Sequence, residues 1–179
     1  MSTAKGLVLY KSKYGATRRY ADMLAHELFC DVCDIGSIGT RGLESYAWIV
    51  FAGGIYASGI LGLSALRRLH DRYPRKKWAV LFVGASPFDE KGFADIKAHN
   101  LKGALQHIPA FYGRGAWDES KMTWKDRTLC QMLQKAVARK NPADCEPWMR
   151  ALLSAAGQTC DWTERKYLLP LIDFLHDKN

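Results

Sequence analysis

Short apolar runs that lead into helical patterns recur along this chain, and they constrain its fold more than any other feature. The clearest runs cover residues 7–11, 48–52 and 78–84, each about one strand long. Apolar residues at helical spacing follow the first two, from Ala21 to Leu28 and from Leu63 to Leu69. Strands that alternate with helices predict right-handed crossovers and a parallel sheet covered on both faces.

Two further strands are expected on weaker patterns, near residues 31–35 and over residues 108–112. Leu129, Met132, Leu133, Ala136 and Val137 share one helical face and predict another amphipathic helix. Because parallel strands place their carboxyl ends along one edge, ligands of such sheets bind at that edge.

The last helix is predicted over residues 168–175, with Asp161 and Glu164 placed as a capping box ahead of it. Pro170 indicates that this helix starts late or bends. The residues before it, 138–160, have the least regular pattern. We expect one domain over residues 1–179, with a C-terminal extension at about 138–179.

Length and composition fit one folded domain. The chain has 179 residues, 48% of them hydrophobic and 25% charged. No run reaches the ~18 apolar residues that span a bilayer, and the first residues lack a signal-peptide layout, so we expect a cytoplasmic protein. The five cysteines are scattered and fit reduced thiols. Cys30 and Cys33 form the one close pair, but no second pair supports a metal site.

The first strand runs into a loop over residues 12–17 that suits a phosphate group. The first N–H groups of a helix lack intrahelical partners, and the helix dipole is positive there. Ser12 and Thr17 add hydroxyl groups, Gly15 lets the backbone approach closely, and Lys13 adds charge. The spacing matches neither an ATP-type P-loop nor a dinucleotide fingerprint. On its own, the same loop also fits a simple helix cap.

Two more loops follow predicted strands and carry aromatic residues. Residues 53–59 contain Tyr56 between glycines, and residues 84–90 contain Phe88 among small residues. A phosphate loop flanked by two aromatic loops fits a ligand with a phosphate at one end and a flat ring at the other, such as flavin mononucleotide (FMN). The residues expected to bind it are Ser12, Lys13, Tyr14, Gly15, Ala16, Thr17, Gly53, Gly54, Ile55, Tyr56, Ala57, Ser86, Pro87 and Phe88.

Residues 12–17 after the first strand and 52–59 after the third resemble the phosphate loop and ring loop of flavodoxins. Further on, the sequences at 111–115, 124–127 and 161–162 are similar to flavodoxin-domain proteins grouped with the menaquinone-dependent, flavodoxin-like protoporphyrinogen oxidases. The resemblance implies an α/β three-layer sandwich whose five-stranded parallel sheet has the order 2-1-3-4-5. It also implies one FMN and redox chemistry on the flavin, with no separate catalytic residue. By the same resemblance, residues 138–160 or the loop at 115–124 would cover the edge of the ligand site.

Two positions depart from the flavodoxin pattern. Tyr14, preceded by Lys13, stands where a hydroxyl residue is usual, and Gly54 stands where many relatives have proline. These departures leave open a flavodoxin-fold binding or regulatory protein without tight FMN.

The net charge of the chain helps to distinguish an oxidase from an electron-shuttle flavodoxin. The formal net charge is +8, whereas flavodoxins that shuttle electrons are typically acidic, as the family resemblance implies. Positive potential stabilises the anionic reduced flavin and favours electrons from an anionic substrate such as a porphyrin with propionates. The basic cluster is Arg67, Arg68, Arg72, Arg75, Lys76 and Lys77. It fits such a substrate, an anionic membrane surface near quinone, or a solvated helix face. No nucleic-acid motif accompanies the charge.

The sequence therefore favours an FMN-dependent oxidoreductase that passes electrons from an anionic small-molecule substrate to a quinone or other acceptor. An electron-transfer flavodoxin that serves a redox partner protein is the alternative within the same fold. Four tryptophans in the last third fit a flavin roof, a pocket for a hydrophobic substrate, or packing of the extra segment; they are Trp117, Trp124, Trp148 and Trp162.

Overall fold

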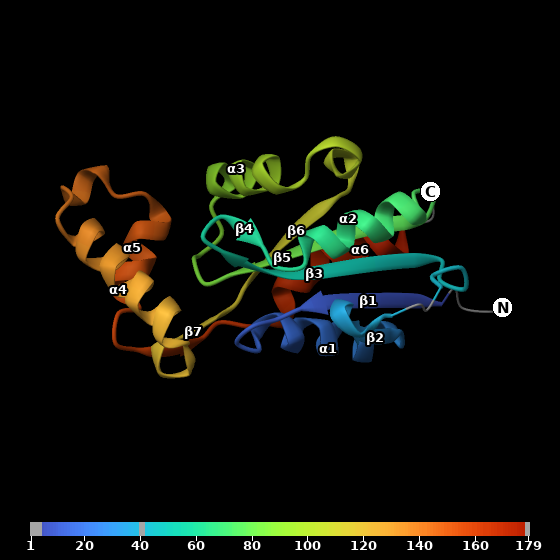
Figure 1. The fold of residues 1–179 in the computed structure, drawn as a ribbon, viewed down its shortest axis with the longest axis horizontal. Helices are drawn as coiled ribbons and strands as arrows, with labels where there is room; N and C mark the ends of the chain where they lie inside the picture. The colour runs from blue at the N-terminus through green and yellow to red at the C-terminus, as the bar shows by residue number, and fades with distance from the viewer. Residues whose placement is uncertain (1–4, 40–41, 178–179) are drawn as a thin grey trace.

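The computed structural model describes residues 5–39 and 42–177. Within these ranges, five parallel strands form the central sheet in the order β2-β1-β3-β5-β6 (Figure 1). They are β1 (Gly6–Lys11), β2 (Asp31–Asp34), β3 (Trp48–Tyr56), β5 (Lys77–Gly84) and β6 (Ala110–Arg114). A short strand, β4 (Gly59–Ile60), pairs antiparallel with the end of β3. Counted as parallel strands alone, the order is the predicted 2-1-3-4-5, and the predicted flavodoxin-like α/β sandwich is confirmed.

Alternate residues of the central strands point to opposite faces and build two cores. Leu9, Phe51 and Val80 face one side, where α2 (Leu63–Arg72) and α3 (Glu90–Asn100) cover the sheet. Val8, Val50 and Leu81 face the other side, where α1 (Ala16–Leu28) and α6 (Leu169–His176) pack. These six side chains are fully buried, as expected for strands covered on both faces.

A segment inserted between β6 and α6 leaves the sandwich, and we call residues 116–161 the arm. Its stem is an antiparallel pair, β7 (Ala116–Asp118) with β8 (Thr159–Asp161). Between these strands lie α4 (Trp124–Ala138) and α5 (Pro147–Ser154), which share a small core of their own around Val137, Cys145 and Met149. Figure 1 shows the arm standing beyond one end of the sheet, away from the helices that cover its faces.

Four sequence predictions concern the arm and the helix that follows it. The helix expected at 129–137 exists as α4, but it belongs to the arm. The added segment is an insertion at 116–161, whereas an extension at about 138–179 was expected. The capping box was wrong, because Asp161 ends β8 and its carboxylate accepts hydrogen bonds from the N–H and hydroxyl of Thr163 (3.1 and 2.7 Å). The last helix starts late, as Pro170 indicated, since α6 begins at Leu169.

The described part of the chain also contains five short 3-10 helices. They are η1 (Ile35–Ser37), η2 (Gly103–His107), η3 (Glu119–Lys121), η4 (Pro142–Asp144) and η5 (Arg165–Leu168). No helix within residues 5–39 and 42–177 is both long and apolar enough to cross a membrane.

Candidate functional site

A cavity of about 410 Å³ lies between the carboxyl ends of the strands and the arm. The loops after β1, β3 and β5 contribute to its lining, as expected for a parallel sheet. Of the predicted binding residues, those that line the cavity are Ser12, Lys13, Tyr14, Ala16, Thr17, Gly54, Ile55, Tyr56 and Ala57. The remaining predicted residues, Gly15, Gly53, Ser86, Pro87 and Phe88, lie outside the lining. The structure thus gathers most of the first two loops in one place.

The loop after β1 is shaped by Ser12 and Gly15. The Ser12 hydroxyl oxygen accepts a hydrogen bond from the Gly15 N–H (3.0 Å), and Gly15 precedes α1 in a left-handed conformation with φ of 99°. This turn directs the N-terminus of α1 toward the cavity, where its free N–H groups and dipole favour an anion. Thr17, in the first turn of α1, is buried against the next loop.

The backbone at Gly54 leaves room for no side chain. A Cβ atom there would lie 2.8 Å from a ring carbon of Tyr56 and 3.2 Å from the Thr17 hydroxyl. Contacts this short would force the neighbours to move. Glycine at this position therefore keeps Thr17 and the two loops close together.

The loop after β3 is a tight hairpin to β4. Ile55 pairs with Ile60 and Tyr56 with Gly59, so Ala57 and Ser58 form a two-residue turn with φ of 47° and 69°. Positive φ at both central residues is the type I′ geometry, which usually takes glycine or asparagine. Backbone strain of this kind clusters at functional sites.

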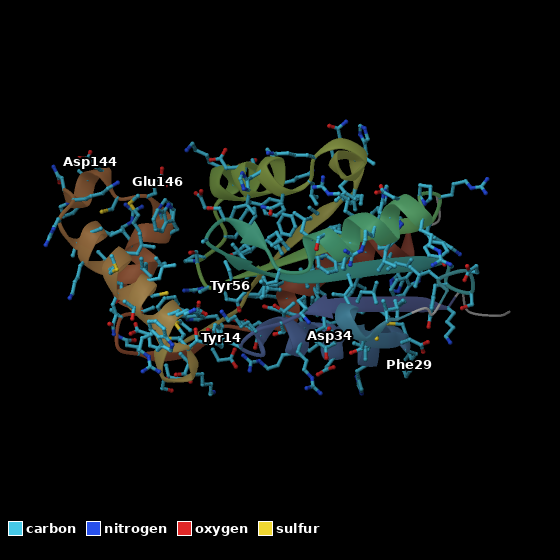
Figure 2. The ribbon with its side chains drawn as sticks, viewed as in Figure 1. Tyr14, Phe29, Asp34, Tyr56, Asp144 and Glu146 are labelled. Atoms are coloured by element: carbon cyan, nitrogen blue, oxygen red, sulfur yellow. The ribbon has the colours of Figure 1, made fainter. Side chains whose placement is uncertain are left out.

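Two tyrosines face each other across the first two loops (Figure 2). The ring centroids of Tyr14 and Tyr56 are 6.0 Å apart, and the Lys13 ammonium lies 5.5 and 5.8 Å from them. Burial raises the pKa of Tyr56 to about 12, so its phenol is neutral at physiological pH.

The loop after β5 is turned toward α3. The Tyr112 hydroxyl donates a hydrogen bond to the Ser86 carbonyl (2.7 Å), and the Phe88 ring packs against Phe93 and Tyr112. Gly84 and Ala85 line the cavity instead. Gly53 is buried inside β3, where an added Cβ would lie 2.4 Å from Ile60. The roles of these residues in binding stay predictions.

The far wall of the cavity comes from the arm; the loop at 115–124 and residues 138–160 were expected at this edge of the site, but α4 was not. The apolar part of this wall consists of Met122, Leu129, Leu133 and Leu152. Leu129 and Leu133 are 58% and 41% exposed, so one face of α4 looks onto the cavity rather than into a core. The spacing of Leu129 and Leu133 predicted the helix. It could not show that the apolar face lines a cavity, because apolar residues recur at the same interval in a helix that packs on a core.

A family model described as a flavodoxin domain matches residues 7–144, more than half of the chain. The chain belongs to the flavodoxin family. The predicted cofactor is confirmed by this membership, because flavodoxin domains bind FMN. In general terms this flavodoxin domain is therefore an FMN-binding redox flavoprotein.

Solved structures of similar fold include three bacterial proteins. The flavodoxin, WrbA-like protein of Agrobacterium tumefaciens is 17% identical over 70% of this chain and 88% of its own, with a TM-score of 0.44. The Trp repressor binding protein of Bacillus subtilis is 21% identical over 62% and 84%, with a TM-score of 0.43. Oxidised flavodoxin 1 of Bacillus cereus is 18% identical over 77% and 100%, with a TM-score of 0.41. Comparison with curated proteins gave no match.

The residues of this flavodoxin domain fit FMN. The loop 12–17 offers a helix N-terminus, hydroxyl groups and Lys13 to a phosphate, and the narrow cradle at Gly54 is one that a Cβ would fill. The rings of Tyr14 and Tyr56 offer planar surfaces beside it. Bound there, FMN would supply hydride or electron transfer, while the protein supplies anchoring and electrostatics.

The arm also reaches the phosphate loop with a carboxylate. Asp126, in the first turn of α4, forms an ion pair with Lys13 and accepts a hydrogen bond from the Tyr14 hydroxyl. The Thr123 N–H donates to the same hydroxyl oxygen (3.2 Å). Hydrogen bonds from Lys13 and Tyr14 lower the pKa of Asp126, so its carboxylate is ionised at neutral pH.

The four tryptophans have different surroundings. Trp117 lines the cavity and is 9% exposed, and its indole N–H donates to Glu119 (3.3 Å). The Trp162 ring lies 3.9 Å from the Arg114 guanidinium, Trp148 packs beside the arm core, and Trp124 is 73% exposed. Three of the four therefore lie outside the cavity.

The basic cluster divides into two groups. Lys76 donates to the carbonyls of Glu44 and Tyr46 (2.6 and 2.7 Å), and Lys77 donates to carbonyls at the end of α6. These two lysines stabilise loop and helix ends. The exposed members are Arg67, Arg68, Arg72 and Arg75.

Proposed function

We propose that this flavodoxin domain is an FMN-dependent oxidoreductase that oxidises an anionic, largely apolar small molecule, as protoporphyrinogen oxidases do, and passes the electrons to a quinone or another acceptor. One observation carries the proposal. The cavity has the loops predicted to bind the flavin on one side and the exposed leucines of α4 on the other. Exposed leucines beside a redox cofactor favour an apolar molecule as the occupant of the remaining space.

Charge around the cavity supports an anionic substrate. Arg19 lines the cavity and pairs with Asp161 through Nη2 (3.1 Å), while its Nε is buried and has no hydrogen-bond partner among the described residues. Such a residue keeps an unused donor for an anionic group. The net charge of +8 would also attract an anionic substrate from a distance.

The test is anaerobic mixing of the FMN-loaded protein with protoporphyrinogen IX, followed by the flavin absorbance. We expect the porphyrinogen to bleach the flavin. Porphyrin fluorescence should appear when the FMN-loaded protein is in at least threefold excess, because forming the porphyrin removes six electrons and each FMN accepts two. If the flavin is reduced by a flavodoxin-type reductase and not by the porphyrinogen, the chain is an electron-transfer flavodoxin. A colourless protein that takes up no added FMN would instead be a binding or regulatory member of the family.

The arm wall can be tested with paired variants on one helix. In Leu129→Asp with Leu133→Asp, we expect substrate-driven reduction to fall at least about tenfold because the apolar wall is lost. FMN affinity should stay within about twofold. Met132→Asp is the matched control, because Met132 lies on α4 and is 63% exposed but does not line the cavity. Equal rates in the double variant and the control would reject the arm as the substrate wall.

A further inference from the structure

Asp126 is the one carboxylate among the described residues that joins the arm to the phosphate loop. It contacts the ammonium of Lys13 and the hydroxyl of Tyr14, which are adjacent in the loop. The Thr123 hydroxyl accepts from the Asp126 N–H (3.3 Å), so the helix cap fixes the backbone that carries this carboxylate. The contact spans 113 positions in sequence and depends on how the arm folds back.

The carboxylate of Asp126 binds groups that could otherwise bind a phosphate, the Lys13 ammonium and the Tyr14 hydroxyl. Lys13 carries one positive charge, and in this arrangement Asp126 neutralises it. A phosphate held at the N-terminus of α1 would lie near an ionised carboxylate, and like charges at this range repel. Lys13 can therefore pair with Asp126 or with a phosphate. Binding both at once costs free energy, because the carboxylate and the phosphate repel each other.

The arm has a core of its own, separate from the cores of the sandwich. Val137, Cys145 and Met149 form a core that shares no residue with the two cores of the sandwich. A two-stranded stem, β7 with β8, connects this unit to the sheet. Breaking the Asp126 contact would therefore release α4 from the phosphate loop at little cost to the arm's internal packing, while the stem stays anchored to α1 through Arg19 and Asp161 (3.1 Å).

We propose that Asp126 is an internal competitor for the phosphate group of the cofactor. It holds the arm against the phosphate loop, and a phosphate-bearing ligand displaces it and releases the arm. This inference rests on FMN binding through residues 12–17, as in the proposed function. In proteins that carry FMN, the released arm would admit the substrate, and Leu129 and Leu133 would then pack against the bound substrate.

The test compares Asp126→Asn with Asp144→Asn by titrating each with FMN and with riboflavin, which lacks the phosphate. Asp144 is the control because it is exposed at the far end of the arm (Figure 2). We expect Asp126→Asn to bind FMN about tenfold more tightly than the wild type and riboflavin with unchanged affinity. Asp144→Asn should match the wild type for both flavins. Equal or weaker FMN binding by Asp126→Asn would overturn the proposal.

Limited proteolysis of the arm gives a second readout that needs no FMN. Without ligand, trypsin should cut Asp126→Asn after Lys121, which lines the cavity, several-fold faster than the wild type, and the sandwich should stay intact. FMN, and not riboflavin, should accelerate the same cut in the wild type. If no form of the protein binds either flavin, the proposed function fails. Ligand-free cleavage then tests whether Asp126 holds the arm against the phosphate loop, and equal rates for the wild type and Asp126→Asn overturn that claim.

Discussion

Ser12 and Thr17 stand at the two ends of the phosphate loop and use their hydroxyl groups differently. The Ser12 oxygen already accepts from the Gly15 N–H, which leaves its proton free to donate. Thr17 is 3% exposed and lies beside the position where a Gly54 Cβ would stand. Both hydroxyls are held in place before any ligand arrives, so each loses little freedom on binding.

Removing both hydroxyls should weaken FMN binding. We expect Ser12→Ala with Thr17→Ala to lose roughly 1–3 kcal/mol of FMN affinity, because each hydroxyl contributes one hydrogen bond to a charged group. Fluorescence titration with FMN measures the loss. Thr128→Ala removes a hydroxyl that donates to the Trp124 carbonyl on the arm and serves as the control. Unchanged affinity in the double variant would show that the phosphate binds elsewhere.

His70 makes the stability of the sandwich depend on pH. It is 8% exposed on α2, its Nδ1 has no hydrogen-bond partner among the described residues, and burial lowers its pKa below 6.5. The unfolded chain therefore takes up the proton first, and stability falls as the pH drops below about 6.5.

We expect His70→Leu to flatten this decline. Urea unfolding at pH 7.5 and pH 5.0 measures the difference for the wild type and the variant, since the other four histidines are common to both. An equal loss of unfolding free energy in both proteins would show that His70 is not the group responsible.

The site residues that could be predicted are those whose functional features lie close together in the sequence. The loop at 12–17 shows its helix start, hydroxyls and glycine within six residues. Ser86 and Phe88 could not be placed, because a hydrogen bond from Tyr112 on another strand turns their loop toward α3. Leu133 and Asp126 could not be assigned either, since their roles depend on where the arm folds back.

Among the elements of the arm, the stem strands and α4 are joined by one side chain, Glu119. One carboxylate oxygen of Glu119 accepts from Trp117 in β7 (3.3 Å), from Gln134 in α4 (3.0 Å) and from the Gly157 N–H before β8 (3.3 Å). The hydrogen bond from Gln134, followed by those from Gly157 and Trp117, lowers the pKa of Glu119. The stem and α4 therefore meet at one charged acceptor.

Glu119→Ala should loosen the arm and leave the sandwich unchanged. Bonds to a charged acceptor contribute about 1.5–3 kcal/mol each, so we expect amide exchange in the arm to accelerate at least about tenfold. Hydrogen exchange followed by mass spectrometry separates arm peptides from those of β1, β3 and β5. Glu146→Ala is the control, because Glu146 accepts from Trp148 within the arm. Faster exchange in the strands as well would contradict an independent arm.

The elements were predictable to the extent that they bury a regular face. The strands over residues 48–52 and 78–84 were evident because they are apolar on both faces. The helix α3 was missed, since Phe93 and Ile96 are its main contributions to the core and give a weak period. The stem strands β7 and β8 are three residues each and carry no alternation that a sequence could reveal.

For the whole molecule, the excess of basic residues should govern how substrates arrive. A net charge of +8 attracts anions over about one Debye length, ~10 Å at 0.1 M salt. We expect the second-order rate of flavin reduction by an anionic substrate to fall several-fold between about 0.02 and 0.2 M salt. Stopped-flow reduction measures it, and a neutral reductant such as a quinol should show little change. The same salt dependence for both reductants would reject electrostatic attraction.

The structure shows the order of the sheet and family membership supports FMN binding, but the site where FMN binds is the central claim of this account. Amide NMR spectra of the protein, recorded during titration with FMN and with riboflavin, test it most directly. We predict that FMN shifts the amides of Gly15, Ala16 and Thr17 together with those of residues 54–57, whereas riboflavin shifts the second group and leaves the first in place. Shifts from FMN that spare residues 15–17, or identical shifts from both flavins, would contradict the claim that this loop holds the phosphate.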